Sequence, residues 1–407
     1  MSPVSESLLT TLLSGTSEVV SADELKQKLA LGRPLRVKLG IDPTATDIHL
    51  GFTVVLRKLR QFQDAGHVAV LIIGDVTARV GDPTGRSATR PQLDAATIHA
   101  NAKTYLEQVS GILDPDRLEV RYNSEWLESM NLGDLVSLMS RMTVAQMLER
   151  NDFANRYAAG SPISITEFLY PLLQGWDSVM VEADIELGGS DQLFNNLVGR
   201  RLQEQVGQVP QVVLTTPLLE GTDGVNKMSK SLNNAIGIRE SPADQFGKTY
   251  SIPDELVTRY MELVTGWPRE ELVATFAQIA SGELPMHTAK RRLARRVVDL
   301  FHGDGAGELA EAQYDEVFKA GAVPEDIPSA FVDPIIFSHG PIPLARLLAI
   351  VNLVPSNKEG ARMLEQGGVR LNGDRINDVE YMIGEEDITG TVCQIGKRRW
   401  ARLELLE

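Results

Sequence analysis

The sequence is nearly free of cysteine. Its 407 residues include a single one, Cys393, so the chain cannot form an intrachain disulfide or a thiolate-based zinc site. Its six histidines show no metal-ligand spacing. We therefore expect no disulfide scaffold, no protein-bound zinc and no other metal held by the side chains of this protein.

Long apolar runs are also missing. No stretch reaches the roughly 20 apolar residues that a membrane-spanning helix requires. The N-terminal segment MSPVSESLLTTLLSG has no basic region leading into an apolar core, so it does not have the pattern of a secretory signal. These absences predict a cytoplasmic protein without a membrane partner.

Positive charge is scarce as well. The chain carries 40 Lys and Arg against 55 Asp and Glu, a net charge of −15. Overall basicity therefore does not hold this protein on a nucleic acid, and any polyanion must meet a local basic stripe. The hydrophobic fraction of 43% is enough for a substantial core, and the length favours two or three domains.

Two common phosphate-binding signatures do not occur. The sequence has no G-x-x-x-x-G-K-[S/T] loop, and no G-x-G-x-x-G follows an expected strand. A nucleotide site in this chain must therefore use another device to hold the phosphates.

The first part of the chain has the pattern of an open α/β domain. Residues 35–42 alternate and then become small, which predicts a strand, and residues 53–67 have helical spacing. Residues 68–75 and 211–219 are apolar runs typical of strands buried on both faces of a parallel sheet. We place this domain at residues 1–235 and expect ligands at the carboxyl ends of its strands.

The rest of the chain changes character twice. Residues 236–325 are helix-patterned and charged, which predicts a helical domain. Residues 326–343 are rich in proline and lack periodicity, so we interpret them as a linker. Residues 344–407 show two short helical patterns and then a turn-rich β segment with Asn372–Gly373, which predicts a small α+β domain.

The stretch GIDPTATDIHLGF, residues 40–52, gathers small polar groups where the first of these strands ends. Gly40 and Gly51 allow a ligand to approach the backbone closely. Asp47 can cap the following helix, and His49 at the helix N-terminus can donate to a phosphate oxygen. On these residues alone, an ordinary capped turn with an incidental histidine is an equally good interpretation.

A second polar stretch, KMSKS at residues 227–231, lies in a loop after the strand expected at 211–219. Its two lysines can swing onto a polyphosphate. A solvated lysine-rich loop is the alternative, and it would be the better interpretation for an isolated pair of lysines.

Together, the histidine-bearing turn and the later KMSKS resemble the class I aminoacyl-tRNA synthetases. Between them lie GDPTGRS (81–87), YPLLQGWD (170–177) and LGGSDQ (187–192), in the order seen in tyrosyl-tRNA synthetases. The C-terminal segment resembles the RNA-binding module named after ribosomal protein S-four. The chain is therefore identified as a member of the bacterial tyrosyl-tRNA synthetases.

This resemblance implies a Rossmann-like parallel-sheet catalytic domain followed by a helical domain and an α+β RNA-binding domain. It implies that L-tyrosine attacks ATP to give tyrosyl-adenylate and pyrophosphate, and that the tyrosyl group then moves to the terminal ribose of tRNA(Tyr). ATP is then a substrate that comes with Mg²⁺, no cofactor is permanently bound, and the assembly is a homodimer. No covalent enzyme intermediate forms, so catalysis needs hydrogen-bond donors and positioning.

The same resemblance assigns roles to individual residues. The catalytic groups it implies are His49, Thr44, Lys227 and Lys230; the ATP-binding residues are Gly40, Asp42, Gly51, Asp191, Gln192 and Lys230; the tyrosine-binding residues are Asp82, Tyr170, Gln174, Asp177 and Lys38. Among them, Tyr170, Gln174 and Asp177 are spaced i, i+4 and i+7, so one face of a helix can present all three to a pocket. Asp177 is expected to accept from the tyrosine hydroxyl.

The RNA-binding module supplies the expected contacts to tRNA. These basic residues are Lys358, Arg362, Arg370, Lys397, Arg398 and Arg399.

Two positions depart from the family pattern. The family's first motif usually ends in a second histidine, where this chain has Phe52. Phe52 cannot donate, and one donor to a charged group contributes about 1.5–3 kcal/mol, which is about 10- to 100-fold in rate. Many bacterial members have a tyrosine where this chain has Lys38, which would either donate to the substrate hydroxyl or pair with Asp177.

Three other interpretations remain at this point. A tryptophanyl-tRNA synthetase would be shorter and would lack the C-terminal module. A catalytically impaired paralogue acting as an RNA-binding protein would bind tRNA but release no pyrophosphate. Another nucleotidyltransferase with a histidine-bearing motif would have no use for an RNA-binding module.

Overall fold

The computed structural model describes residues 6–44, 46–84, 94–319, 327–338, 340–396 and 399–406. Contacts between residues divide the chain into two compact units, Met1–Glu311 and Ala312–Glu407, and each unit has a hydrophobic core of its own. Among the residues that the structure describes, no helix is long and apolar enough to cross a membrane.

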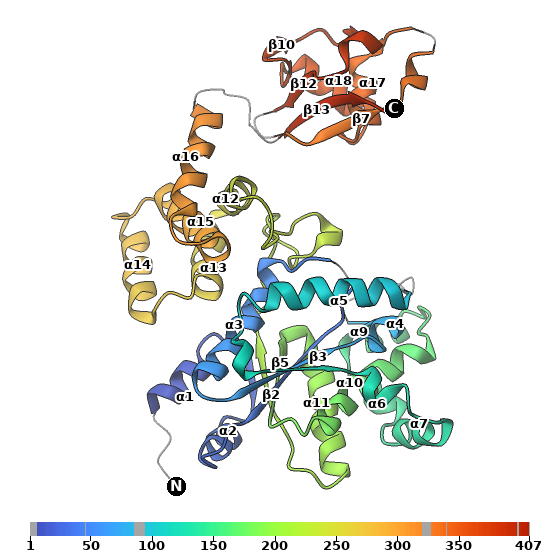
Figure 1. The fold of residues 1–407 in the computed structure, drawn as a ribbon, viewed down its shortest axis with the longest axis vertical. Coiled ribbons are helices and arrows are strands. Elements are labelled where there is room, and N and C mark those ends of the chain that lie inside the picture. The colour runs from blue at the N-terminus through green and yellow to red at the C-terminus, as the bar shows by residue number, and fades with distance from the viewer. Residues whose placement is uncertain are drawn as a thin grey trace. The chain divides into compact units, whose positions relative to one another are not determined.

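A six-stranded sheet lies at the centre of the first unit (Figure 1). Its order is β1-β6-β5-β2-β3-β4, with β1 antiparallel to β6 and the other neighbours parallel. The strands are β1 (Glu18–Val20), β2 (Arg36–Ile41), β3 (Val68–Ile73), β4 (Leu118–Tyr122), β5 (Ile185–Gly189) and β6 (Val212–Thr216). From β2 the chain continues to β3 and β4 on one side of the sheet, and it later forms β5 and β6 on the other side. The topological switch point therefore lies between β2 and β5.

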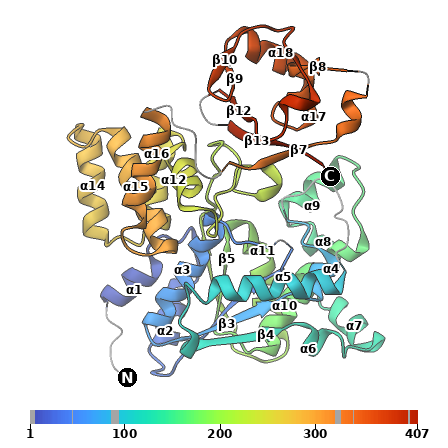
Figure 2. The ribbon, with the colours of Figure 1, turned by 45° about the horizontal axis from the view of Figure 1, so that its top comes forward.

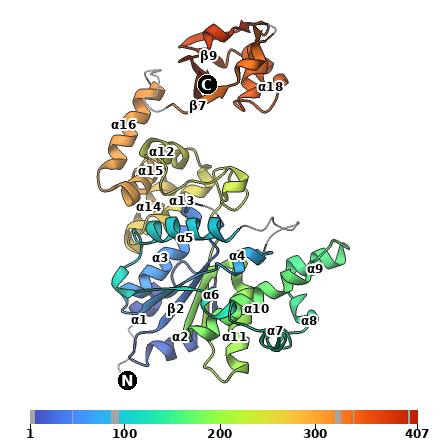
Figure 3. The same cartoon turned by 45° about the vertical axis from the view of Figure 1, so that its right-hand side comes forward.

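Helices cover both faces of this sheet (Figures 1 and 3). The described α-helices that begin in this unit are α1 (Glu6–Leu13), α2 (Ala22–Leu29), α3 (Leu50–Asp64), α4 (Thr77–Val80), α5 (Ala95–Val109), α6 (Ser124–Leu127), α7 (Leu132–Met139), α8 (Val144–Met147), α9 (Asn151–Ala158), α10 (Ile165–Met180), α11 (Leu193–Gln205), α12 (Pro242–Tyr250), α13 (Val257–Val264), α14 (Arg269–Ser281), α15 (Met286–His302) and α16 (Ala306–Lys319). α3 and α5 lie on one face, and α10 and α11 lie on the other.

Alternation along the strands explains this layering. In β3, Leu71 and Ile73 belong to the core that includes residues of α3 and α5, whereas Val70 and Ile72 belong to the core with residues of α10 and α11. A strand that is buried on both sides has no polar face. The structure thus confirms the parallel α/β fold, and it confirms strands within 35–42, 68–75 and 211–219.

A second sheet forms the centre of the other unit (Figure 2). Its order is β10-β9-β12-β13-β7. The elements of this unit include β7 (Ser329–Val332), β8 (Ile342–Pro343), α17 (Leu344–Ile350), α18 (Asn357–Glu365), β9 (Val369–Leu371), β10 (Asp374–Ile376), β11 (Met382–Ile383), β12 (Val392–Ile395) and β13 (Arg399–Leu405). β9 and β10 form a hairpin in which Asn372 and Gly373 both have positive φ, 50° and 93°, as the Asn-Gly pair predicts.

Residues 326–343 are not the structureless linker that their composition suggests. In the described part of this segment, β7 pairs in parallel with β13, and β8 pairs with β11. The chain reaches these pairings across distant positions, Ser329 opposite Arg402 for example, so local periodicity could not reveal them. The helical pattern at 236–325 corresponds to α12–α16, and the exact domain boundaries remain predictions.

Candidate active site

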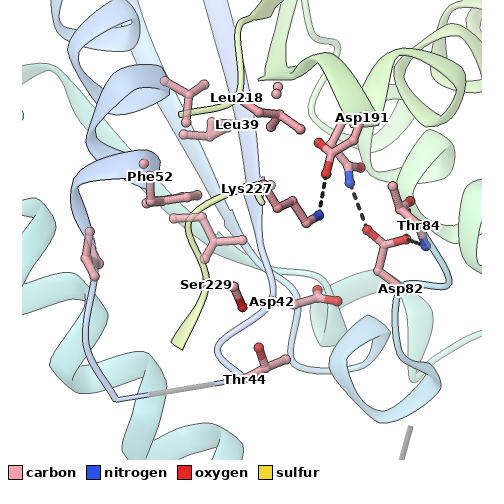
Figure 4. A pocket seen from close by; sticks show the side chains of 18 of the residues that line it. Leu39, Asp42, Thr44, Phe52, Asp82, Thr84, Asp191, Leu218, Lys227 and Ser229 are labelled. Carbon is pink, nitrogen blue, oxygen red and sulfur yellow. Dashed lines mark hydrogen bonds and ion pairs between the residues drawn. The ribbon is translucent and has the colours of Figure 1, made fainter. Parts of the chain in front are cut away.

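A cavity of about 960 Å³ opens at the carboxyl ends of β2, β3, β5 and β6 (Figure 4). Gly40 at the end of β2, Gly74 after β3, Gly189 at the end of β5 and Thr216 at the end of β6 all line it. The cavity therefore lies at the switch point, where this architecture binds ligands. An added Cβ at Gly40 would meet open space, so the backbone there is accessible to a ligand.

The histidine-bearing turn, residues 40–44 and 46–52 and named the signature turn here, forms one wall of the cavity. Thr44, His49 and Gly51 line it, and His49 is the residue immediately before α3. Two side chains of α5 hold this turn from behind: the Asn101 amide donates to the Pro43 carbonyl at 3.0 Å, and Gln108 accepts from the Ile48 amide at 2.9 Å. Sequence reasoning missed this support, because no local pattern links α5 to the turn.

The surroundings of His49 favour its neutral form. Burial, and then the nearby Lys230 and Lys227, lower the pKa of His49 to about 4. Its Nδ1 atom is buried without a hydrogen-bond partner. A neutral imidazole at a helix N-terminus can donate one hydrogen bond to an anion that enters the cavity.

The KMSKS loop packs against the signature turn, where the Gly51 amide donates to the Met228 sulfur at 3.3 Å. Lys227 and Lys230 both line the cavity, and each is paired with a carboxylate there. The Lys227 ammonium lies 2.9 Å from Asp191, as Figure 4 shows, and that of Lys230 lies 2.6 Å from Asp47. These four side chains are 24–46% exposed, and such exposed pairs contribute little stability. The lysines can therefore exchange their carboxylate partners for phosphate oxygens.

One face of α10 carries three cavity residues, as the spacing predicts. Tyr170, Gln174 and Asp177 all line the cavity, and the helix begins with a capping box between Ser164 and Glu167. Such a box satisfies backbone amides that the first helical turn leaves unpaired. The register of this face is therefore fixed from the helix start.

Asp42 holds Tyr170 in place. Its two carboxylate oxygens accept from the Tyr170 hydroxyl at 2.8 Å and the Thr77 hydroxyl at 2.7 Å. Gly74 makes room for this arrangement, since an added Cβ would lie 2.1 Å from the Asp42 carboxylate. Asp42 lines the cavity, but these bonds place it at the α10 side, with Tyr170.

Asp177 is buried, with 3% of its surface exposed. The Trp126 indole donates to it at 2.8 Å, and the Asn123 amide donates at 3.4 Å. Burial raises the pKa of Asp177 to about 7, against the opposing effects of Lys38 and of these two donors. Sequence reasoning did not identify Trp126 and Asn123, since they come from a different part of the chain.

Asp177→Asn is expected to stabilise the protein above pH 7. The folded-state pKa near 7 exceeds the ordinary value of 3.8, so the native state binds this proton more tightly than the unfolded chain. The stability from this group is complete below pH 4 and is lost as pH rises through 7. That loss amounts to about 4 kcal/mol, so urea unfolding should favour the variant at pH 8 but not at pH 4. An advantage that stays constant with pH would contradict this expectation.

Asp82 and Gln192 meet across the cavity from different segments. The Gln192 amide donates to Asp82 at 2.8 Å, and Asp82 also accepts from the Thr84 amide at 2.9 Å (Figure 4). Gln192 in turn accepts from Asn195 at 3.0 Å. The structure thus brings the aspartate of GDPTGRS and the glutamine of LGGSDQ together beside Asp191.

Lys38 is not among the described residues that line the cavity. It is fully buried, and its ammonium lies 2.8 Å from Glu186. One expectation from the sequence was a direct pair of Lys38 with Asp177. This prediction is wrong, because Lys38 pairs with Glu186 instead. The pairing depends on strand register between β2 and β5, which the local sequence does not reveal.

Phe52 lines the cavity next to Tyr105 of α5. The two rings meet edge to face, with centroids 6.5 Å apart. Phe52 thus adds apolar surface where the family usually has a donor. His49 and Thr44 remain as the donors of the signature turn.

The expected tRNA-binding residues belong to the second unit. Lys358 and Arg362 lie on α18, Arg370 on β9 and Arg399 on β13, and all four are exposed. Lys397 and Arg398 lie outside the described residues. Within the parts of the chain that the structure describes, no group of three or more His, Cys, Asp or Glu is arranged to hold a metal ion.

Two family models match this chain. Residues 30–319 match the tRNA synthetases class I (W and Y), and residues 342–388 match the S4 domain. The first match includes every cavity residue assigned above. The second includes α17, α18, β9 and β10.

Individual relatives agree with these matches. Tyrosine–tRNA ligases from Salinibacter ruber and Moorella thermoacetica are each 50% identical to this chain, over 98% and 96% of it and over 97% and 94% of their own lengths. A C-terminally truncated mitochondrial tyrosyl-tRNA synthetase from Coccidioides posadasii is similar in structure, with a TM-score of 0.61 and 25% identity over 75% of this chain and 90% of its own. A tyrosyl-tRNA synthetase from Archaeoglobus fulgidus, solved with L-tyrosine, shares the fold at a TM-score of 0.61 and 21% identity, over 75% of this chain and 98% of its own.

Proposed function

The chain belongs to the tyrosine–tRNA ligases of the class I tRNA synthetase family, and we propose that the cavity described above is where it joins L-tyrosine to AMP. The observation that carries this proposal is the convergence of five distant segments on one cavity. The signature turn, residues 81–84, α10, the 187–192 segment and the KMSKS loop all line it.

In the first step, the tyrosine carboxylate attacks the α-phosphate of ATP, and pyrophosphate leaves. Lys227 and Lys230 move from Asp191 and Asp47 onto the leaving phosphates, where negative charge grows. His49 and Thr44 donate to the phosphates from the signature turn. Preorganised donors aimed at developing charge are the main source of rate in such a step. The enzyme supplies no nucleophile, because the substrate carboxylate is one already.

The two ends of tyrosine find different partners. Asp82, Tyr170 and Gln174 bind the α-ammonium, and Asp177 accepts from the phenol hydroxyl. Asp177 is buried, so phenylalanine would leave its oxygen without a partner, and an unpaired buried acceptor is costly. Asp191 and Gln192 then lie where the ribose and the reacting carboxylate meet, with Gly40 and Gly51 lining the adenosine side.

Mg²⁺ enters with ATP. The phosphates are its natural oxygen ligands, since the carboxylates Asp47 and Asp191 are paired with lysines. Mg²⁺ supplies charge neutralisation on the phosphates, and the residues of this chain orient them.

The second unit binds tRNA(Tyr) through the sheet face on which Arg370 and Arg375 are exposed. Register places Arg375, Arg370, Gln394 and Trp400 side by side on β10, β9, β12 and β13. Their neighbours along each strand, such as Val369 and Cys393, are buried in the core. A row of cations and an aromatic ring on one face suits phosphates and unpaired bases.

The active assembly is a homodimer, and it resides in the cytoplasm. On α7, Leu132, Val136 and Met139 are 77%, 56% and 39% exposed, at the i, i+4 and i+7 spacing of one helix face. Val144 of α8 and Ile165 of α10 are also exposed apolar side chains, at 61% and 73% exposure. Contiguous exposed apolar surface marks an interface, and a second copy of the chain is its occupant.

Val136→Asp is expected to convert the dimer to a monomer at micromolar concentration, because a two-fold interface places the new charge in both halves. Sedimentation velocity measures the change. Val273→Asp is the matched control, since Val273 is 60% exposed on α14, outside this face. A dimer that survives in the α7 variant, or a wild type that is monomeric, would rule out this interface.

Charging of purified tRNA(Tyr) tests the whole function. The protein should attach tyrosine to this tRNA in the presence of ATP, and tryptophan should give no product. Binding of tRNA without charging by any amino acid would instead show the impaired, RNA-binding paralogue.

A further inference from the structure

A buried ion pair lies directly beneath the α10 side of the cavity. Lys38 on β2 and Glu186 on β5 are neighbours in the parallel register. Their side chains are 0% and 1% exposed, and the ammonium lies 2.8 Å from the carboxylate. The pair sits on the sheet face that α10 and α11 cover, since the residues on either side, Val37 and Leu187 for instance, belong to the opposite core.

Such a pair is poorly explained by stability alone. Removing two charges from water is expensive, and well-packed apolar residues of similar size often stabilise a protein as much or more. The cost is reduced only when further hydrogen bonds satisfy the remaining atoms. The positions of those hydrogen bonds therefore indicate what the pair does.

The hydrogen bonds of the pair converge on α10. The Lys38 ammonium donates to the Gln174 carbonyl at 2.9 Å and to the Ser178 hydroxyl at 2.7 Å. The Ser178 hydroxyl in turn donates to Glu186 at 3.0 Å. Gln211 also donates to Glu186. The pair thus holds the backbone of Gln174, the residue assigned to the tyrosine ammonium. It also holds the side chain of Ser178, which is next to Asp177.

We propose that Lys38 is a positioning residue for tyrosine binding, acting with Glu186 from beneath the cavity to fix the face of α10 that carries Gln174 and Asp177. The inference rests on the proposed function. Lys38 itself touches no substrate, because it does not line the cavity.

The charge of Lys38 also favours the carboxylate form of Asp177. The groups that face Asp177 are Lys38 from β2, Glu186 from β5, Trp126 on α6 and Asn123 just before it, with Tyr170 on its own helix. Lys38 lowers the pKa of Asp177, and Glu186 raises it by less. Since the carboxylate is the better acceptor for the tyrosine hydroxyl, Lys38 extends tyrosine binding to lower pH.

The test is the pH dependence of the tyrosine dissociation constant, measured by equilibrium titration from pH 5.5 to 8.5. Lys38→Met should raise the pH below which affinity for tyrosine is lost. Tyrosine binding at pH 7 should be about tenfold weaker. Glu186→Gln should lower the pH below which affinity is lost, because it removes a negative charge and leaves Lys38 in place. The kcat for activation at saturating tyrosine should change much less than KM.

Opposite shifts from the two partners distinguish this role from a structural one, since loss of packing would weaken binding in the same direction for both. Lys28→Met is the control. It removes another buried lysine, which lies 3.7 Å from Asp184 and makes no hydrogen bond to α10 among the described contacts, and it should leave the pH profile unchanged. If a variant fails to fold, the double variant Lys38→Met with Glu186→Gln carries no unpaired charge and should still show a smaller upward shift.

Unchanged profiles, or shifts in the same direction, in variants that bind tyrosine would overturn the inference and leave the proposed function intact. A wild type that does not bind tyrosine would overturn the proposed function itself.

Discussion

Lys230→Ala is expected to slow tyrosyl-adenylate formation about 10²- to 10³-fold, with the dissociation constant of tyrosine unchanged. Lys230 lies 2.6 Å from Asp47, and in the proposed step it meets the pyrophosphate only as charge develops there. A group that acts in the transition state lowers kcat, not substrate affinity. Rapid-quench measurement of adenylate formation in a single turnover gives this rate directly.

Lys248→Ala provides the control for this prediction. Lys248 is also a half-exposed lysine paired with a carboxylate, Glu240 at 2.8 Å, but it lies on α12 and does not line the cavity. Its loss should leave the single-turnover rate unchanged. Equal losses in the two variants would show that overall charge, and not the position of Lys230, supports the reaction.

Asp177→Ala is expected to reduce kcat/KM for tyrosine about 10- to 100-fold, since one hydrogen bond to a charged group is lost. Phenylalanine, which has no hydroxyl to offer, should lose nothing and gain from the removal of a buried carboxylate. The preference for tyrosine over phenylalanine should therefore fall by more than tyrosine activity alone. Parallel activation assays with the two amino acids measure both changes.

Trp126→Phe tests the indole donor separately from the Asp177 carboxylate. The indole donates to Asp177 at 2.8 Å, and phenylalanine keeps most of the ring without the donor. This variant should retain more of the tyrosine preference than Asp177→Ala. A tyrosine-to-phenylalanine ratio that is the same in Asp177→Ala as in the wild type would show that another residue recognises the hydroxyl.

Local periodicity was sufficient where one element carries the information. The spacing of Tyr170, Gln174 and Asp177 predicts a shared helix face, and the structure confirms that all three line one cavity. The apolar run at 68–75 likewise predicts a strand buried on both faces, as β3 is. In these segments the period of the helix or strand determines which side chains share a face.

The sequence was insufficient where two distant segments meet. Lys38 pairs with Glu186 because β2 and β5 are neighbours in register, and Trp126 reaches Asp177 because α6, which follows β4, lies beside α10. The strand β7, inside the expected linker, needs β13 as its partner. None of these contacts follows from the period of either segment by itself, so each required the fold.

Tyrosine-dependent exchange of pyrophosphate into ATP measures most directly whether this cavity activates tyrosine. The purified protein would be assayed with tyrosine, tryptophan or phenylalanine as the only variable. We expect exchange with tyrosine alone, and this exchange should fall with Lys230→Ala and persist with Lys248→Ala. Exchange with tryptophan in place of tyrosine, or none with any of the three by a folded protein, would contradict this expectation.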